Sequence, residues 1–322
     1  MSSNLENFPN NVKPVEKYEY DGESYSVYGF KFEGIYDLYN YLIADPEINE
    51  GAFGNKYRVS SITNDSDFAG KPYDIALKEL LDSDDERYGY FLRIGKAIET
   101  SKKRSVSRFV PYNSVSGGVI RPEAIATGDP HIYRSAKVIQ TEGYININAL
   151  IGYNCGNTKE QVFNRAIILT NVINALEENG YQVNVNAFET SLKGGGDHGE
   201  IIKILFKIKR GNSGINYQAL YRSMCYVEFF RRLLFRVFES SDVSLYWGGT
   251  YGRTIEKPMN VDLLGLDKKD LYFDQPSSME IRGYDLVEDF ERAINNLGLN
   301  DKINVKREKE KIRRLKNNLV IK

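Results

Sequence analysis

The chain has 322 residues, 41% of them hydrophobic and 27% charged, and its formal net charge is −1. These proportions are typical of a folded globular protein and exclude disorder as its main state. A net charge this small creates no global field that would attract nucleic acid or an anionic membrane. Two cysteines are too few for a secreted disulfide framework, so we expect a reducing compartment. Neither a signal-peptide pattern nor an apolar run of ~20 residues is found, so export and membrane insertion are not expected.

Residues 1–100 predict a small, mainly helical N-terminal region. The Asp-Gly pair at 21–22 lies between segments rich in tyrosine and valine, which is typical of a β-hairpin. Apolar residues at helical spacing predict short helices at 37–43, after the Lys-Pro pair at 71–72, and at 88–100.

Residues 101–135 show neither helical nor alternating periodicity. Glycine and proline are frequent in this stretch, as they are in structured loops and in connections between domains. We therefore interpret it as a connector.

From residue 136 onward the pattern becomes regular. Alternating apolar residues predict a strand at 144–151, and the capping-box spacing Thr158-x-x-Gln161 opens an apolar helix at 159–178. Strands at 182–188 and 201–208 are joined by a glycine-rich loop and are expected to pair as a hairpin at one edge of the sheet.

Three further elements follow in the sequence: a long apolar helix at 216–239, a strand at 243–247 and a helix at 285–297. The whole order predicts an α/β fold with a mostly parallel sheet covered by helices on both faces, which makes a three-layer sandwich. We divide the chain into an N-terminal α+β region, the connector, an α/β domain and a basic C-terminal helix. Their bounds are 1–100, 101–135, 136–300 and 301–322.

The order of elements over about residues 136–300 resembles that of von Willebrand factor A-like (vWA-like) domains, whose fold is Rossmann-like. In that family the turn after the first strand carries D-x-S-x-S, which ligates a divalent cation. The matching positions here are Leu150, Gly152 and Asn154, and none of them has a carboxylate or a hydroxyl group. The resemblance therefore implies a degenerate metal site, with no metal ion and no other cofactor.

The upstream part is also similar to a family of uncharacterised bacteriophage and prophage proteins. The residues that carry this similarity are Phe68-Ala69-Gly70-Lys71 with Ala76, Ser116-Gly117-Gly118 with Pro122, and Gly128-Asp129-Pro130. The resemblance implies a viral setting, in the host cytoplasm or in a virion, and it carries no activity.

No catalytic motif is recognisable, and we name no catalytic residue. His131 and His198 lack a second ligand at metal-binding spacing, and an exposed histidine in a glycine-rich turn is commoner than a catalytic Asp197–His198 pair. The glycine-rich segments 194–199 and 248–254 lack the G-K-[ST] of a P-loop. The balance is against an enzyme, but an enzyme whose site only geometry can reveal stays open.

The leading functional hypothesis is therefore a non-enzymatic, phage-encoded interaction or structural protein that binds a viral or host protein. Contact is expected at the turn before the 159–178 helix and at the glycine-rich segment near residue 250. The candidate contact residues are Asn154, Asn157, Thr158 and Arg253.

The alternative is nucleic-acid binding. Residues 302–322 hold nine Lys/Arg and two Glu, with apolar residues at helical spacing, and so predict a basic amphipathic helix. Such a helix either packs its apolar stripe on the domain and leaves its charges solvated, or contacts phosphates. Candidate nucleic-acid contacts are Lys102, Lys103, Arg104, Arg108, Lys306, Arg307, Arg313 and Arg314. The oligomeric state does not follow from the sequence.

Overall fold

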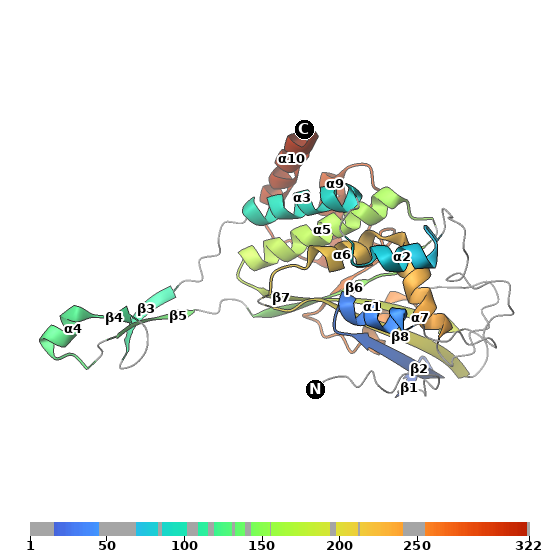
Figure 1. Ribbon diagram of the computed structural model, residues 1–322, viewed down its shortest axis with the longest axis horizontal. Helices are drawn as coiled ribbons and strands as arrows, with labels where there is room; N and C mark the ends of the chain where they lie inside the picture. The colour runs from blue at the N-terminus through green and yellow to red at the C-terminus, as the bar shows by residue number, and fades with distance from the viewer. Residues whose placement is uncertain are drawn as a thin grey trace.

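The computed structural model describes residues 16–44, 69–82, 86–101, 109–114, 119–130, 133–138, 143–154, 156–193, 198–211, 213–240 and 255–320. These residues form a main body built on a six-stranded sheet, and a small three-stranded sheet that projects from it (Figure 1). The fold is mixed α/β, as predicted.

The main sheet has the strand order β1-β2-β8-β7-β6-β9. The strands are β1 (Glu16–Tyr20), β2 (Glu23–Phe32), β6 (Tyr144–Leu150), β7 (Gln182–Lys193), β8 (His198–Lys209) and β9 (Leu271–Phe273). β6 is parallel to both β7 and β9, and β2 is parallel to β8. The hairpins β1–β2 and β7–β8 are antiparallel, so the sheet is mixed.

The β7–β8 hairpin lies inside the sheet, and the prediction that it would form an edge is wrong. β2 pairs along the free side of β8 in a register that runs from Ser24–His198 to Phe32–Phe206. The predicted N-terminal hairpin is confirmed, with a turn at Asp21 and Gly22, both at positive φ. The division at residue 100 thus separates strands that share one sheet, because β2 supplies apolar residues to the same core as β8.

Most helices of the described residues contribute to one core, which lies on one side of the main sheet (Figure 1). They are α1 (Ile35–Ile43), α2 (Tyr73–Glu79), α3 (Glu86–Ser101), α5 (Lys159–Glu178), α6 (Tyr217–Cys225), α7 (Phe235–Glu239), α9 (Leu286–Leu297) and α10 (Val305–Val320). α8 (Lys257–Leu263) instead packs against Tyr25, Val27 and Ile201, whose side chains alternate to the second face.

The second face is therefore covered unequally, which departs from the expected three-layer sandwich. Asparagines replace apolar residues where α8 does not reach. Asn184 donates a hydrogen bond to Asn146 at 2.9 Å, and Asn186 donates one to Asn148 at 3.2 Å. Polar side chains that bond to one another need no helix over them, which explains why the layers differ.

α5 is the central helix, and its predicted bounds at 159–178 are confirmed. Thr158 accepts a hydrogen bond from the Gln161 N–H, and the Gln161 side chain accepts one from the Thr158 N–H, so the predicted capping box is formed. All residues from Val162 to Leu176 except Asn164 are buried. A helix buried all round is expected where it lies between a sheet and other helices.

The apolar segment predicted as one helix over 216–239 is broken. α6 ends at Cys225, and Tyr226 has extended backbone with φ −87° and ψ 109°. A π-helical turn, η2 (Phe229–Leu234), then leads into α7. The break brings this segment against α2, where the Tyr226 hydroxyl donates to Glu79 at 2.7 Å and the Arg232 Nε donates to the Lys71 carbonyl at 3.0 Å.

The predicted connector contains structure of its own, which sequence periodicity did not indicate. Its small antiparallel sheet has the order β3-β5-β4, with β3 (Phe109–Ser114), β4 (Val119–Ile120) and β5 (Tyr133–Val138). α4 (Pro122–Thr127) begins with proline and ends at Gly128 in the left-handed conformation, φ 69°. The strand predicted at 243–247 lies outside the described residues, while β9 and α8 were not predicted.

Candidate functional site

The first candidate site is the turn that joins β6 to α5, at residues 151–158. It leaves the carboxyl end of β6, where the parallel neighbours β7 and β9 also run toward their carboxyl ends. Ligands of open α/β sheets bind outside this edge. The turn also contains Gly152 and Asn154, two of the positions at which the sequence resemblance led us to expect a degenerate metal site.

A carboxylate from β7 holds this turn from inside the protein. Glu189 is fully buried, and its Oε2 accepts a hydrogen bond from the Gly152 N–H at 2.6 Å. Burial raises the pKa of Glu189 well above its ordinary value, and the Gly152 N–H and the charge of Arg165 oppose that rise. Glu189 therefore fixes the backbone of the turn without being exposed to solvent.

Arg165 brings a buried positive charge to the same place. It is 0% exposed on α5, its Nη2 contacts the Met224 sulfur at 3.7 Å, and its guanidinium lies 5.9 Å from the centroid of the Phe273 ring. Burial lowers the pKa of Arg165 to about 10, and Asp274, which directly follows β9, opposes that fall. Arg165 thus stays charged at neutral pH. Among the described residues, its Nε and Nη1 have no hydrogen-bond partner.

Tyr153 completes this buried cluster, which we define as the buried residues Tyr153, Arg165 and Glu189 together with the half-buried Asp274. The Tyr153 hydroxyl also lacks a hydrogen-bond partner in the described part of the chain. Burial raises the pKa of Tyr153 to about 12, although the charges of Arg231 and Arg165 act in the opposite direction. Arg165 and Glu189 are closed to solvent, so the cluster can position the turn but cannot receive a substrate at these two side chains.

Glu189 of β7 therefore reaches the turn, and Asp274, directly after β9, acts on the charge of Arg165; the motif positions considered in the sequence did not predict either carboxylate. In the described ranges, no group of three or more His, Cys, Asp or Glu side chains is arranged to hold a metal ion. Sequence reasoning missed Arg165 and Glu189. The available signal was a single charged residue on an otherwise apolar helix face and another that continues the alternating apolar positions 183, 185 and 187 of a strand.

The predicted contact residues of the turn do lie together. Asn154 is exposed, and its N–H donates to the Gln275 side chain at 3.0 Å. Asn157 donates to the Asn154 carbonyl through both its N–H and its side-chain amide. Thr158 is exposed but its hydroxyl caps α5. Arg253 lies outside the described residues.

The basic residues of α10 are largely engaged with the main body. Arg307 and Lys311 both pair with Glu178 of α5, at 2.5 and 2.7 Å, and Lys309 pairs with Glu291 of α9. Lys306 and Arg313 are exposed. Arg314 pairs with Glu310 on the outer surface. The other candidate nucleic-acid contacts, Lys102, Lys103, Arg104 and Arg108, lie outside the described residues.

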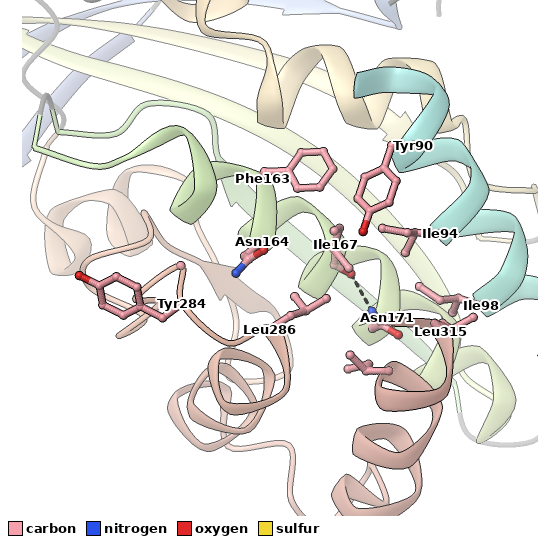
Figure 2. Close-up of a pocket in the computed structure, with 12 residues that line it drawn as sticks. Tyr90, Ile94, Ile98, Phe163, Asn164, Ile167, Asn171, Tyr284, Leu286 and Leu315 are labelled. Atoms are coloured by element: carbon pink, nitrogen blue, oxygen red, sulfur yellow. Dashed lines mark hydrogen bonds between the residues drawn. The ribbon is translucent and has the colours of Figure 1, made fainter. Parts of the chain in front are cut away.

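The second candidate site is a groove between α3, α5, α10 and the segment that enters α9 (Figure 2). Its cavity has a volume of about 200 Å³. The side chains that line it are mostly apolar or aromatic: Tyr90, Ile94, Ile98, Phe163, Asn164, Ile167, Asn171, Tyr284, Leu286, Ile312 and Leu315, together with Gly283. Tyr284 is 91% exposed, so the groove reaches the protein surface at that side chain.

Comparison with known proteins gives a family. The family model described as Domain of unknown function (DUF7192) matches residues 11–301. The chain belongs to this family. No curated protein and no solved structure matches the chain. No helix in the described ranges combines the length and apolar character needed to cross a membrane.

The match to the DUF7192 family ends before α10 begins. The buried cluster thus lies wholly within the matched residues, whereas the groove takes one wall from α10. Ile312 is 1% exposed and Leu315 is half-buried, so α10 packs an apolar stripe onto α9 and α3. The two candidate sites therefore differ in how much of each the family match covers.

Proposed function

We propose that this protein is a non-enzymatic interaction protein whose α/β body is a degenerate vWA-like domain. In this proposal the turn at 152–158 binds a protein partner, viral or from the host, without a metal ion. The observation that carries the proposal is the buried Glu189 carboxylate, which holds the Gly152 N–H at 2.6 Å with the Arg165 charge near it.

The order of strands supports the vWA-like reading. β8-β7-β6-β9 corresponds to the order 3-2-1-4 of the doubly wound fold, when β6 is counted as the first strand. β8 is reversed because it returns through a hairpin. Two features depart from that pattern: the β1–β2 hairpin extends the sheet beyond β8, and α8 is the one described helix that packs on the second face.

The chemistry of the turn favours binding over catalysis. Its charged supports are buried, and the hydroxyl of Thr158 is used to cap α5. What the turn offers to solvent at Asn154 is an amide, which forms hydrogen bonds but is neither a nucleophile nor a general base.

Two internal side chains also explain why binding would not need a cation. A divalent ion in such a turn gathers oxygen ligands and so fixes the backbone. Here Glu189 fixes the backbone directly, and Arg165 supplies positive charge from α5. The viral setting, in the host cytoplasm or in a virion, rests on the sequence motifs alone.

Site-specific photocrosslinking tests this proposal. A crosslinking amino acid replaces Asn154 in the turn or, as the control, the exposed Glu19 on β1 at the opposite edge of the sheet. We expect a discrete protein adduct from position 154 that is absent from position 19 and unchanged by EDTA. The captured protein, once purified, is titrated against the full chain with and without EDTA, and we expect equal affinities.

Three results would contradict the proposal. Loss of the adduct in EDTA would show that binding at the turn depends on a metal ion. An adduct that nuclease removes would favour the nucleic-acid alternative. Identical adducts from positions 154 and 19 would show that the turn has no special role.

A further inference from the structure

The surface under α10 carries an inference that is independent of the turn at 152–158. We propose that this surface, formed by α3, α9 and the C-terminal end of α5, is a binding site for a basic amphipathic helix of another protein. In this proposal α10 is the occupant that the chain itself supplies, and a partner helix of the same chemistry displaces it. The proposal stands on the charges around α10, on its incomplete packing, and on the extent of the family match.

The main body presents acidic side chains where α10 lies. Glu178, the last residue of α5, is 3% exposed and pairs with both Arg307 and Lys311 of α10. The C-terminal end of a helix carries a partial negative charge, to which Glu178 adds a full one, so this end of α5 favours cations. On α9, Glu291 pairs with Lys309. The surface therefore favours a helix that carries basic residues at these positions.

Between these acidic side chains the surface is apolar, and α10 meets it with a narrow stripe. Ile312 is buried, and Val305 and Leu315 are half-buried against the same core. Positions 305, 312 and 315 fall on one face of a helix. The surface thus needs only an apolar stripe flanked by cations, which an amphipathic helix of another protein can supply in the same way.

The fit of α10 to this surface is incomplete. A cavity of about 200 Å³ remains between α10, α3, α5 and the segment that enters α9. Protein interiors are normally close-packed, so such a cavity forfeits contacts that larger side chains would make. Asn171 lines this cavity, and its buried side-chain oxygen has no hydrogen-bond partner among the described residues. A helix with larger apolar side chains at positions 312 and 315 would fill space that α10 leaves empty.

The surface lies within the residues that match the family, whereas its occupant does not. The match ends at residue 301, and α10 begins at Val305. Leu299 and Ile303, just before α10, are 1% and 2% exposed, so they hold the chain in place and allow α10 to leave without α9. The surface also extends past α10 to Tyr284, which lines the groove and is 91% exposed. Exposed tyrosines of this kind are enriched among the side chains that dominate protein interfaces.

A fluorophore-labelled peptide of residues 304–320 tests the proposal by fluorescence anisotropy with the full chain. In the unaltered protein α10 competes from within the chain at a high effective concentration, so we expect weak binding. The double variant Lys309→Glu and Lys311→Glu should release α10, because it places negative charges opposite the acidic side chains of α5 and α9. This released variant should bind the peptide roughly tenfold more tightly than the unaltered protein, or better.

The matched control changes the same number of charges on the exposed face of α10. The variant Lys306→Glu and Arg313→Glu should bind the peptide as weakly as the unaltered protein, because neither residue touches the acidic side chains of the surface. Equal binding by the released and control variants would show that overall charge attracts the peptide, and would overturn the proposal.

Two altered peptides separate the charges from the apolar stripe, with the released variant as the receptor. One carries Lys309→Glu and Lys311→Glu, and the other carries Ile312→Ser and Leu315→Ser and keeps every charge. Each should bind roughly tenfold more weakly than the native peptide, because the site needs both features. Equal binding of all three peptides would show that the site recognises neither feature and would overturn the proposal.

Two other results would overturn it. A released variant that keeps its circular dichroism spectrum but does not bind the peptide would show that α10 cannot be replaced. A dimer that the peptide converts to monomers would identify a second copy of this chain as the occupant. If the released variant does not fold, hydrogen exchange of the unaltered chain decides. Amides of residues 308–315 should then open as one unit and exchange faster than those of residues 166–173 in α5, and equal protection would contradict release of α10.

Discussion

The buried cluster and the groove are two polar sites on the same helix, and they solve the problem of burial differently. At the cluster, Arg165 has N–H groups without hydrogen bonds among the described residues, and the charge of Asp274, directly after β9, favours its charged form. At the groove, Asn171 is neutral, and its buried side-chain oxygen has no hydrogen-bond partner among the described residues. The buried charge is thus offset by an opposite charge nearby, whereas the buried neutral amide leaves one hydrogen bond unmade.

The largest expected loss of stability comes from substitutions in the buried cluster. Glu189→Leu or Arg165→Met alone should lower the free energy of unfolding by about 3–5 kcal/mol. Glu189→Leu leaves the buried Arg165 charge and the Gly152 N–H without Glu189, and Arg165→Met leaves Glu189 without the positive charge that opposes the rise of its pKa. The double variant should be less destabilised than the sum of the two single variants. Urea unfolding measures all three. Glu160→Gln, an exposed acid on the same helix, is the control and should stay within ~0.5 kcal/mol. Additive losses would show that Glu189 and Arg165 are not coupled.

The cluster also predicts a pH dependence of stability. The pKa of Glu189 is raised in the folded state, so the native protein keeps this proton at a pH where the unfolded chain has already released it. The stability that the raised pKa contributes is complete below the ordinary value of 4.5 and is lost as the pH rises toward the folded pKa. Relative to Glu189→Gln, the unaltered protein should therefore become less stable as the pH rises above 4.5. Unfolding curves at several pH values measure this difference, and a constant difference would contradict it.

A smaller effect is expected at the groove, where α10 meets the body. Ile312 is 1% exposed and lines the cavity, so Ile312→Ala should lower the free energy of unfolding by about 2–4 kcal/mol. The adjacent exposed residue gives the control Arg313→Ala, which should leave the free energy of unfolding unchanged. Equal effects of the two variants would show that the stripe of α10 is not packed.

The sequence predicted elements whose signals are local. The Asp-Gly turn of the N-terminal hairpin and the capping box of α5 each lie within a few residues, and both are confirmed. β9 has three residues, which is too short for an alternating pattern, and its place beside β6 depends on a long-range pairing. The break at Tyr226 likewise depends on contacts with α2, which lies about 150 residues away in the chain. Periodicity in one segment carries no information about such partners.

The candidate sites show the same contrast between signals within a short segment and long-range pairing. Asn154, Asn157 and Thr158 could be placed together because they are neighbours in sequence. Glu189 could not be joined to Gly152, because 37 residues separate them and only the parallel pairing of β6 and β7 brings them together. The groove could not be predicted from the sequence for a similar reason, because its four walls come from four separate segments.

The smallest expected effect separates packing from nucleic-acid binding at α10. Glu178 is 3% exposed and pairs with Arg307 and Lys311, which are themselves partly solvated, so Glu178→Gln should lower the free energy of unfolding by about 1–2 kcal/mol. The surface pair of Glu310 and Arg314 gives the control Glu310→Gln, with a change of less than ~0.5 kcal/mol.

Glu178→Gln also leaves the side-chain charges of Arg307 and Lys311 without their carboxylate partner, so the same variant tests nucleic-acid binding. If α10 served to bind phosphates, Glu178→Gln would raise the affinity for a labelled DNA duplex and steepen its dependence on salt, because each additional phosphate contact releases counterions. We expect fluorescence anisotropy to detect no binding of either protein at physiological ionic strength. The reason is that Glu178 and Glu291 already neutralise the inner cations of α10, which leaves, among the side chains of α10 that the structure describes, Lys306 and Arg313 as exposed charges two turns apart on one face. Two contacts of that kind are too few to hold a duplex against salt, so the charges of α10 act chiefly to attach it to the helices that it covers.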